Sequence, residues 1–139
     1  MQPFDPIGCG LPHREPFIFI DAVVALEPGK SAVCTRRFAA SETFFRGHFP
    51  GHPLVPGVIL TEAAAQTAGI AAGEAGRVFH LSAIRQMKFM RPVLPESEVE
   101  FRAERTGGIG GMLQFQVSAR VGGEVVAEGV IVLNDAQQS

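Results

Sequence analysis

Two histidines and one glutamate are the side chains of this sequence best suited to proton transfer. His48 and His52 lie in the segment RGHFPGHP, where glycine and proline restrict the backbone. Glu62 follows in the apolar run VILTEAAAQTAG. A base and an acid of different types in neighbouring segments suit a reaction in which one proton leaves the substrate and another is delivered to it.

The two histidines have three interpretations: a metal pair, a general base, or loop structure alone. Their spacing of four residues lies in a loop rather than a helix, and no third ligand is evident, so we predict no metal. Gly47 and Phe49 flank His48, permitting close approach of a substrate and excluding water. These neighbours favour His48 as the base, whereas loop structure accounts for His52.

Glu62 is unusual because a carboxylate in an apolar segment costs free energy unless it is paired or protonated. Burial favours the protonated form of a carboxyl group, which makes it a proton donor. Gln66 lies four residues further on, on the same face of a helix, and would orient the carboxyl. The alternative is that Glu62 faces water along one polar stripe of that helix.

Backbone donors complete the set, because Pro56 suits the first turn of a helix that begins near Gly57. The first N–H groups of a helix lack internal partners and carry partial positive charge. The amides of Gly57 and Val58 would therefore hold a carbonyl oxygen whose negative charge grows as the adjacent carbon loses its proton. Base, acid and oxyanion donors together fit removal of an α-proton beside a thioester.

The elements that must position these groups are a buried helix and several strands. The segment from Gly57 to Gly76 is apolar on nearly every face, so we expect a helix inside the protein. Alternating and β-branched runs, with glycine turns at 107–111 and 122–123, predict antiparallel strands. These strands are expected at 17–26, 30–38, 98–104, 113–121 and 125–133. We predict an α+β fold, a curved sheet wrapped around a central helix, in a single domain over residues 1–139.

Composition excludes several classes of partner. The net charge is −2 and no run of basic residues occurs, so neither nucleic acid nor an anionic membrane is expected. No apolar run reaches the ~18 residues of a spanning helix, and the first residues do not resemble a signal peptide. Cys9 and Cys34 lack metal-ligand spacing and are expected as reduced thiols of a cytoplasmic protein. A hydrophobic content of 46% suggests a subunit interface, an apolar ligand cavity, or both.

Three segments closely resemble the FabZ family of 3-hydroxyacyl-acyl-carrier-protein dehydratases. They are LPHREPF (11–17), GHFPGHPLVPGVILTEAAAQ (47–66) and KFMRPV (88–93), and the resemblance extends over roughly residues 10–133. It implies the hotdog fold, in which an antiparallel sheet wraps a long helix. It also implies dehydration of a (3R)-3-hydroxyacyl carrier protein to the trans-2-enoyl product, with no metal or organic cofactor.

The resemblance also assigns roles. It implies that His48 takes the C2 proton and Glu62 protonates the departing 3-hydroxyl. Gly57, with Val58 beside it, matches the glycine whose amide holds the thioester carbonyl, and Gln66 matches a supporting glutamine. In relatives the base and acid come from different subunits, which implies a homodimer with shared active sites, and three such dimers often form a hexamer. A related family with isomerase activity usually has aspartate at the position of Glu62, so plain dehydration is favoured.

The partner implied is an acidic acyl carrier protein with its acyl-phosphopantetheine arm. Arg85, Lys88 and Arg91 are the candidates for binding it, although a solvated surface is the favoured explanation for each of them. Met90 replaces a basic residue of the relatives, and 95–97 replaces their usual Pro-Gly-Asp turn, so chain-length preference and carrier partner stay open.

Three further expectations complete this interpretation. For His13 and Arg14 the resemblance implies a packing and hydrogen-bonding role near the dimer. Two other functions remain: a hotdog thioesterase that delivers water to the carbonyl, and a non-catalytic module that binds acyl thioesters. The intact segment 47–66 argues against the first, and the presence of both His48 and Glu62 argues against the second.

Overall fold

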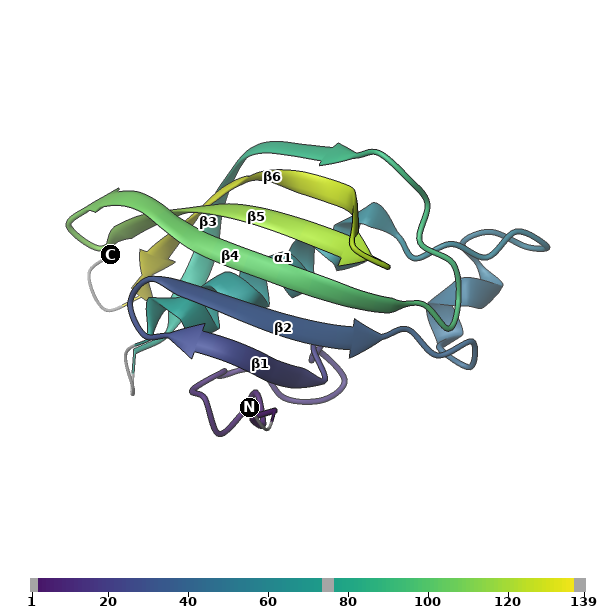
Figure 1. Ribbon diagram of the computed structural model, residues 1–139, viewed down its shortest axis with the longest axis horizontal. Coiled ribbons are helices and arrows are strands. Elements are labelled where there is room, and N and C mark those ends of the chain that lie inside the picture. Colours follow the sequence, from purple (N-terminus) through teal and green to yellow (C-terminus); the bar gives the residue numbers. More distant parts are fainter. Residues whose placement is uncertain (1–2, 74–76, 137–139) are drawn as a thin grey trace.

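The computed structural model describes residues 3–73 and 77–136. Within them, one six-stranded antiparallel sheet curves around one long helix (Figure 1). The strand order is β1-β2-β4-β5-β6-β3. The elements are β1 (Ala22–Glu27), β2 (Ser31–Arg37), the 3-10 helix η1 (Thr43–Arg46), α1 (Gly57–Ala72), β3 (Phe79–Phe89), β4 (Glu98–Ile109), β5 (Met112–Val121) and β6 (Glu124–Asp135). The predicted α+β class and the helix enclosed by a sheet are confirmed.

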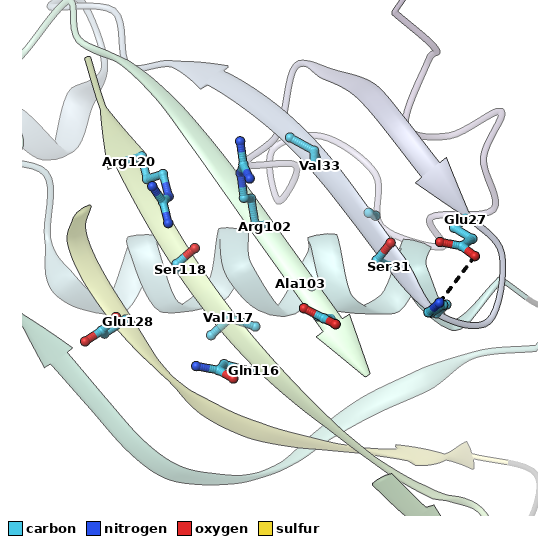
Figure 2. A pocket seen from close by; sticks show the side chains of 13 residues that line it. Glu27, Ser31, Val33, Arg102, Ala103, Gln116, Val117, Ser118, Arg120 and Glu128 are labelled. Carbon is cyan, nitrogen blue, oxygen red and sulfur yellow. Dashed lines mark ion pairs between the residues drawn. The ribbon is translucent and has the colours of Figure 1, made fainter. Parts of the chain in front are cut away.

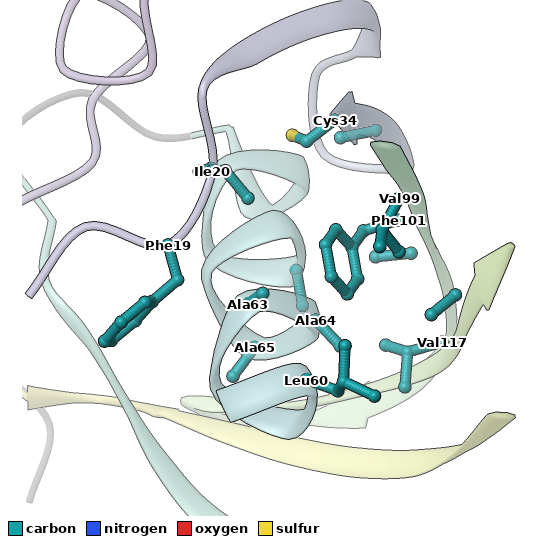
Figure 3. Packing of buried hydrophobic residues seen from close by; sticks show 14 of the residues in the cluster. Phe19, Ile20, Cys34, Leu60, Ala63, Ala64, Ala65, Val99, Phe101 and Val117 are labelled. Atoms are coloured by element: carbon teal, nitrogen blue, oxygen red, sulfur yellow. The ribbon is translucent and has the colours of Figure 1, made fainter. Parts of the chain in front are cut away.

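α1 is buried along most of its length because small apolar residues let the sheet approach it closely. Ala63, Ala64, Ala68 and Ala71 have no exposed surface. Figure 3 shows the alanines of α1 packed beside Phe101 of β4, which is also fully buried. Burial of this apolar surface is the main force that holds the helix in place. The fixed helix in turn fixes the position of its first residues.

The helix ends four residues earlier than predicted. Gly73 follows Ala72 with a left-handed φ of 70°, and its N–H donates to the carbonyl of Ile70. A β-carbon at residue 73 would lie 2.5 Å from the amide nitrogen of Gly29, so this position accepts only glycine. Residues 74–76, to which the predicted helix extended, lie outside the described residues.

Two strands differ from the prediction. β1 begins at Ala22 rather than at residue 17, because the preceding segment pairs with a side chain of α1 instead of with a strand. β3 was not predicted at all. It is an edge strand, exposed at most positions, and its pairing with β6 shifts register between Leu81 and Ala83 and between Ile84 and Gln86. These irregularities remove the alternation by which a strand is recognised.

The other strands and both hairpins are confirmed. β2, β4, β5 and β6 cover the predicted segments, and β4 extends through Gly107 and Gly108 to Ile109. Gly122 and Gly123 have φ values of 59° and 83° and join β5 to β6, as a two-residue turn with two positive φ angles requires.

The two edges of the sheet differ in their surroundings. The edge strand β1 is bridged by Phe4 of the N-terminal segment, which exchanges backbone hydrogen bonds with Val23. At the other edge, β3 exposes the apolar side chains of Leu81, Ile84 and Phe89. No helix in the described parts of the chain is long and apolar enough to cross a membrane.

Candidate active site

His48 lies near the beginning of the loop that leads from η1 to α1. Its amide donates to the carbonyl of Phe44, and its own carbonyl accepts from the amide of Leu54, so the backbone is held on both sides. The imidazole stacks on Phe49 with ring centroids 4.0 Å apart, and its Nδ1 lies 3.2 Å from the carbonyl oxygen of Leu54. Because a carbonyl oxygen only accepts, this contact places the proton on Nδ1 and leaves Nε2 as a base.

His48 and Gly57 open onto the same cavity, of about 320 Å³. The remaining lining is mostly apolar and comes from the loop before α1, from α1, from the end of β3 and from the segment after β3: Leu54, Val55, Leu60, Phe89, Met90, Arg91, Pro92 and Val93. A cavity of this size and lining suits an acyl chain with a few polar groups at one end.

The start of α1 supplies free backbone donors beside His48. The carbonyl of Pro56 accepts from the amides of Ile59 and Leu60. In the part of the chain that the structure describes, the amides of Gly57 and Val58 have no recorded backbone acceptor, as expected for the first turn of a helix. Gly57 lines the cavity, whereas the side chain of Val58 is 77% exposed.

The carboxyl group of Glu62 is held by Gln66, which lies one turn further along α1. Gln66 is 1% exposed, and its Nε2 donates to Oε2 of Glu62 at 3.0 Å. The amide of Gln66 also pairs with the backbone of the segment before β1: Nε2 donates to the carbonyl of Phe17, and Oε1 accepts from the amide of Phe19, both at 3.0 Å. These backbone partners fix which end of the amide faces Glu62. The carboxyl group therefore has a defined orientation.

The structure does not bring His48 and Glu62 of one chain together. Among the described residues, Glu62 is not part of the lining of the His48 cavity. Its carboxyl lies instead near His13, whose Nε2 is 3.5 Å from Oε2. Within one chain, the base and the acid therefore do not line a common cavity.

The three basic candidates are spread out. Arg91 lines the His48 cavity and pairs with Glu124. Arg85 lines a different depression with Gly107 and Gly108. Lys88 is exposed on β3, opposite Glu128 of β6 in the sheet register. Only Arg91 therefore lies at the cavity that holds His48.

A depression of about 520 Å³ extends across β2, β4 and β5 (Figure 2). Its lining mixes charges of both signs, among them Arg102, Arg120, Glu104 and Glu128. In the described chain, none of the predicted site residues lines it. His48 and Gly57 line the cavity at the start of α1 instead.

Other polar residues have structural surroundings. His52 is exposed, and its backbone exchanges hydrogen bonds with Phe49 within the loop. Arg14 donates through one nitrogen to the carbonyls of the three residues before it. Burial raises the pKa of the Cys34 thiol to about 12. No group of three or more potential metal ligands occurs in residues 3–73 and 77–136.

Sequence reasoning missed two contacts of this site. The proximity of His13 to Glu62 joins residues far apart in the chain, and the ring of Phe89 lies over Gly57 only because β3 ends there. The contact between Phe89 and Gly57 could have been anticipated only if β3 had been predicted as a strand.

Comparison with known proteins agrees with this geometry. The sequence model of the ApeI-like family, described as ApeI dehydratase, matches residues 25–130. The chain is 42% identical over 125 residues to the 3-hydroxyacyl-(acyl-carrier-protein) dehydratase FabZ of Ruminiclostridium cellulolyticum, covering 87% of this chain and 88% of that protein. It is 40% identical over 124 residues to the protein of the same name from Acidiphilium cryptum, covering 85% and 75%.

A solved structure is also similar in fold. The dehydratase heterocomplex ApeI:P from Xenorhabdus doucetiae matches with a TM-score of 0.79 at 16% identity, covering 97% of this chain and 95% of that one. The predicted hotdog fold is thereby confirmed. Sequence identity of about 40% over most of both chains, together with the family match, decides the assignment. The chain belongs to the FabZ family of 3-hydroxyacyl-acyl-carrier-protein dehydratases.

Proposed function

We propose that two copies of this chain dehydrate (3R)-3-hydroxyacyl carrier protein to the trans-2-enoyl product, with His48 of one copy and Glu62 of the other at each site. The observation that carries the proposal is the shared apolar cavity of His48 and Gly57. It combines a base whose Nε2 is free with a backbone amide at the start of a helix. This pair suits proton removal next to a thioester carbonyl.

The steps follow from the chemistry of these groups. The amide of Gly57, assisted by that of Val58, binds the thioester oxygen and stabilises its developing negative charge. Nε2 of His48 takes the C2 proton, and the electrons of that C–H bond form the C2–C3 double bond. The C3–O bond breaks as the carboxyl proton of Glu62 moves to the hydroxyl, which leaves as water. Gln66 orients the carboxyl for this transfer.

Three features support a dimer. Glu62 is absent from the His48 cavity of its own chain, β3 is an open edge, and apolar side chains beside the cavity are exposed. Val58, Phe89 and Met90 are 77%, 49% and 45% exposed, which is unfavourable unless another surface covers them. Pairing of β3 with β3 of a second copy about a twofold axis would provide partners for the unpaired backbone N–H and C=O groups of this edge. It would also cover these side chains. A hexamer of three such dimers remains a prediction from the resemblance.

The acyl group would arrive on the phosphopantetheine arm of an acidic carrier protein. Arg91 at the cavity supports this route, because a guanidinium there would attract the phosphate of the arm. Lys88 and Arg85 would extend the basic surface along β3. A carrier protein of this kind, and two reduced thiols, suit a cytoplasmic enzyme.

The proposal is tested by following the conjugated enoyl thioester formed from 3-hydroxyacyl carrier protein. His48→Ala and Glu62→Gln should each lower the rate by about 10²–10⁴-fold. Near-wild-type turnover in both variants would refute the assignment. Release of free thiol without enoyl product would identify a thioesterase instead. Binding of the acyl thioester without any turnover would identify a non-catalytic module.

A further inference from the structure

Arg36 is a charged side chain on the inner face of the sheet. It follows Ala32 and Cys34 at alternate positions of β2, and both of those residues are buried in the core. The side chain of Arg36 is itself only 14% exposed, and its guanidinium lies over the ring of Phe38, 5.4 Å from the ring centroid. Arginine stays charged in proteins, so its burial costs free energy unless polar partners surround it. Arg36 therefore needs partners, and their positions decide which segments it can hold in place.

One end of the Arg36 guanidinium contacts the segment before β1. Its Nη1 donates to the carbonyl of Ile18 at 3.3 Å and to Oδ1 of Asp21 at 3.1 Å. The residues on either side of Ile18 bind the side-chain amide of Gln66 through their backbone, and that amide donates to Glu62. This end therefore braces the segment that sets the orientation of the acid.

The other end of the guanidinium contacts the start of the segment that carries the base. Its Nη2 forms an ion pair with Oε1 of Glu42, the residue immediately before η1. The carbonyl of Glu42 accepts from the amide of Phe45 in that short helix, and the carbonyl of Phe44 accepts from the amide of His48. This end therefore fixes the turn that holds the backbone of the base.

We propose that Arg36 is a positioning residue for both catalytic groups of its chain, an inference that rests on the proposed function. The donors of a guanidinium lie in a fixed planar fork, so one side chain can hold two segments at a defined separation. For stability alone, an apolar side chain of similar volume is often as good as a buried ion pair. The bonds of Arg36 instead fix geometry, and a displacement of about 1 Å in a catalytic group can cost about 10²-fold in rate. Because His48 and Glu62 of one chain serve different sites of the proposed dimer, each Arg36 acts on both sites.

The first test separates turnover from substrate binding. Among the described residues, Arg36 is not part of the lining of the cavity that holds His48 and Gly57. Arg36→Met, which is apolar and lacks the donors, should therefore lower kcat by about 10²-fold and change KM by less than about threefold. Arg36→Lys keeps the charge and should lose less. Arg102→Met, which removes an exposed pair with Glu100, is the control and should keep the wild-type kcat.

The second test uses mixed dimers to separate the two ends of the guanidinium. A dimer of one His48→Ala chain and one Glu62→Gln chain has one site with both groups. The first chain supplies the acid of that site and the second chain supplies the base. Glu42→Ala should lower the rate about tenfold when it is placed in the chain that supplies the base, and less than about twofold in the other chain. Asp21→Ala should show the reverse.

Glu42→Ala and Asp21→Ala are matched, because each removes one carboxylate partner of Arg36 and leaves the guanidinium in place. A general loss of stability would lower the rate equally from either chain, whereas positioning depends on which chain carries the substitution. Equal effects from both chains, or no effect from either, would overturn the inference. A wild type that forms no enoyl product would instead overturn the proposed function. An active wild type with an inactive mixed dimer, Asp21 and Glu42 being intact, would overturn the shared sites on which the inference rests.

Discussion

The ring of Phe89, at the end of β3, lies directly over Gly57, the first residue of α1. A β-carbon at residue 57 would be 3.0 Å from Cζ of Phe89, with two further ring atoms at 3.1 and 3.3 Å. Both residues line the cavity of His48. This contact therefore links the open edge of the sheet to the backbone donor of the site, and only glycine fits beneath the ring as it stands.

Gly57→Ala should lower kcat/KM by about 10–100-fold, because the added methyl group displaces Phe89 and the amide that holds the thioester oxygen. The unfolding free energy should fall by only about 1–3 kcal/mol, as in other overpacked sites. Phe89→Leu added to Gly57→Ala should restore part of the activity. Gly107→Ala, where a β-carbon meets nothing within 4 Å, is the control. Wild-type kcat/KM in Gly57→Ala would exclude the proposed role of this contact.

Gln66→Ala should destabilise the fold as well as reduce activity. The substitution leaves the buried amide of Phe19 and the part-buried carbonyl of Phe17 without this partner, which should cost about 2–4 kcal/mol in urea unfolding. Gln114→Ala, whose side chain bonds among the described residues only to exposed Thr106, should change stability by less than about 0.5 kcal/mol. Equal losses in the two variants would contradict the bracing role of Gln66.

Ile84→Lys tests the free edge of the sheet. Ile84 is 51% exposed on β3, and a charge there should disfavour pairing with a second copy. We expect sedimentation to show more monomer, with activity falling in proportion to the dimer that remains. Ile7→Lys, in the N-terminal segment, is the control for an added surface charge. Full activity from a monomer of either variant would argue against sites shared between subunits.

Thiol labelling tests the packing around β2. Burial raises the pKa of Cys34 to about 12, so the thiol stays protonated and unreactive at pH 8, where a free thiol would be partly ionised. Cys9 is only half-buried and should react first, although its pKa is also raised by burial. Cys34 should react only after unfolding in urea. Rapid modification of both thiols in the native protein would show that the core is more open than described.

The sequence alone correctly predicted those elements in which the pattern of apolar and polar residues matches the burial found in the structure. α1 is apolar on nearly every face and is buried along most of its length, and β4 and β5 alternate because one face packs on α1. β3 could not be predicted, because an exposed edge strand with two register shifts carries no alternation. The end of α1 was placed too late, although Gly73 is a residue type typical of helix ends.

The candidate site also divides into residues that the sequence predicted and contacts that it did not. His48, Gly57, Glu62 and Gln66 were predicted from residue type, from spacing in and before one helix and from the family resemblance, and the structure places Gln66 beside Glu62. The contact of His13 with Glu62 depends on tertiary packing that no local pattern encodes. That His48 and Glu62 do not meet within one chain also follows from the fold alone.

The central claim is that each site takes its base and its acid from different subunits, and mixing two inactive variants tests it most directly. His48→Ala and Glu62→Gln homodimers are combined at equal concentrations, subunits are exchanged in mild denaturant, and enoyl product is measured after dilution. In a mixed dimer, one site then holds both His48 and Glu62, so about a quarter of the wild-type rate should return. If both groups acted from the same chain, every site would lack one of them, and the mixture would remain as inactive as its components.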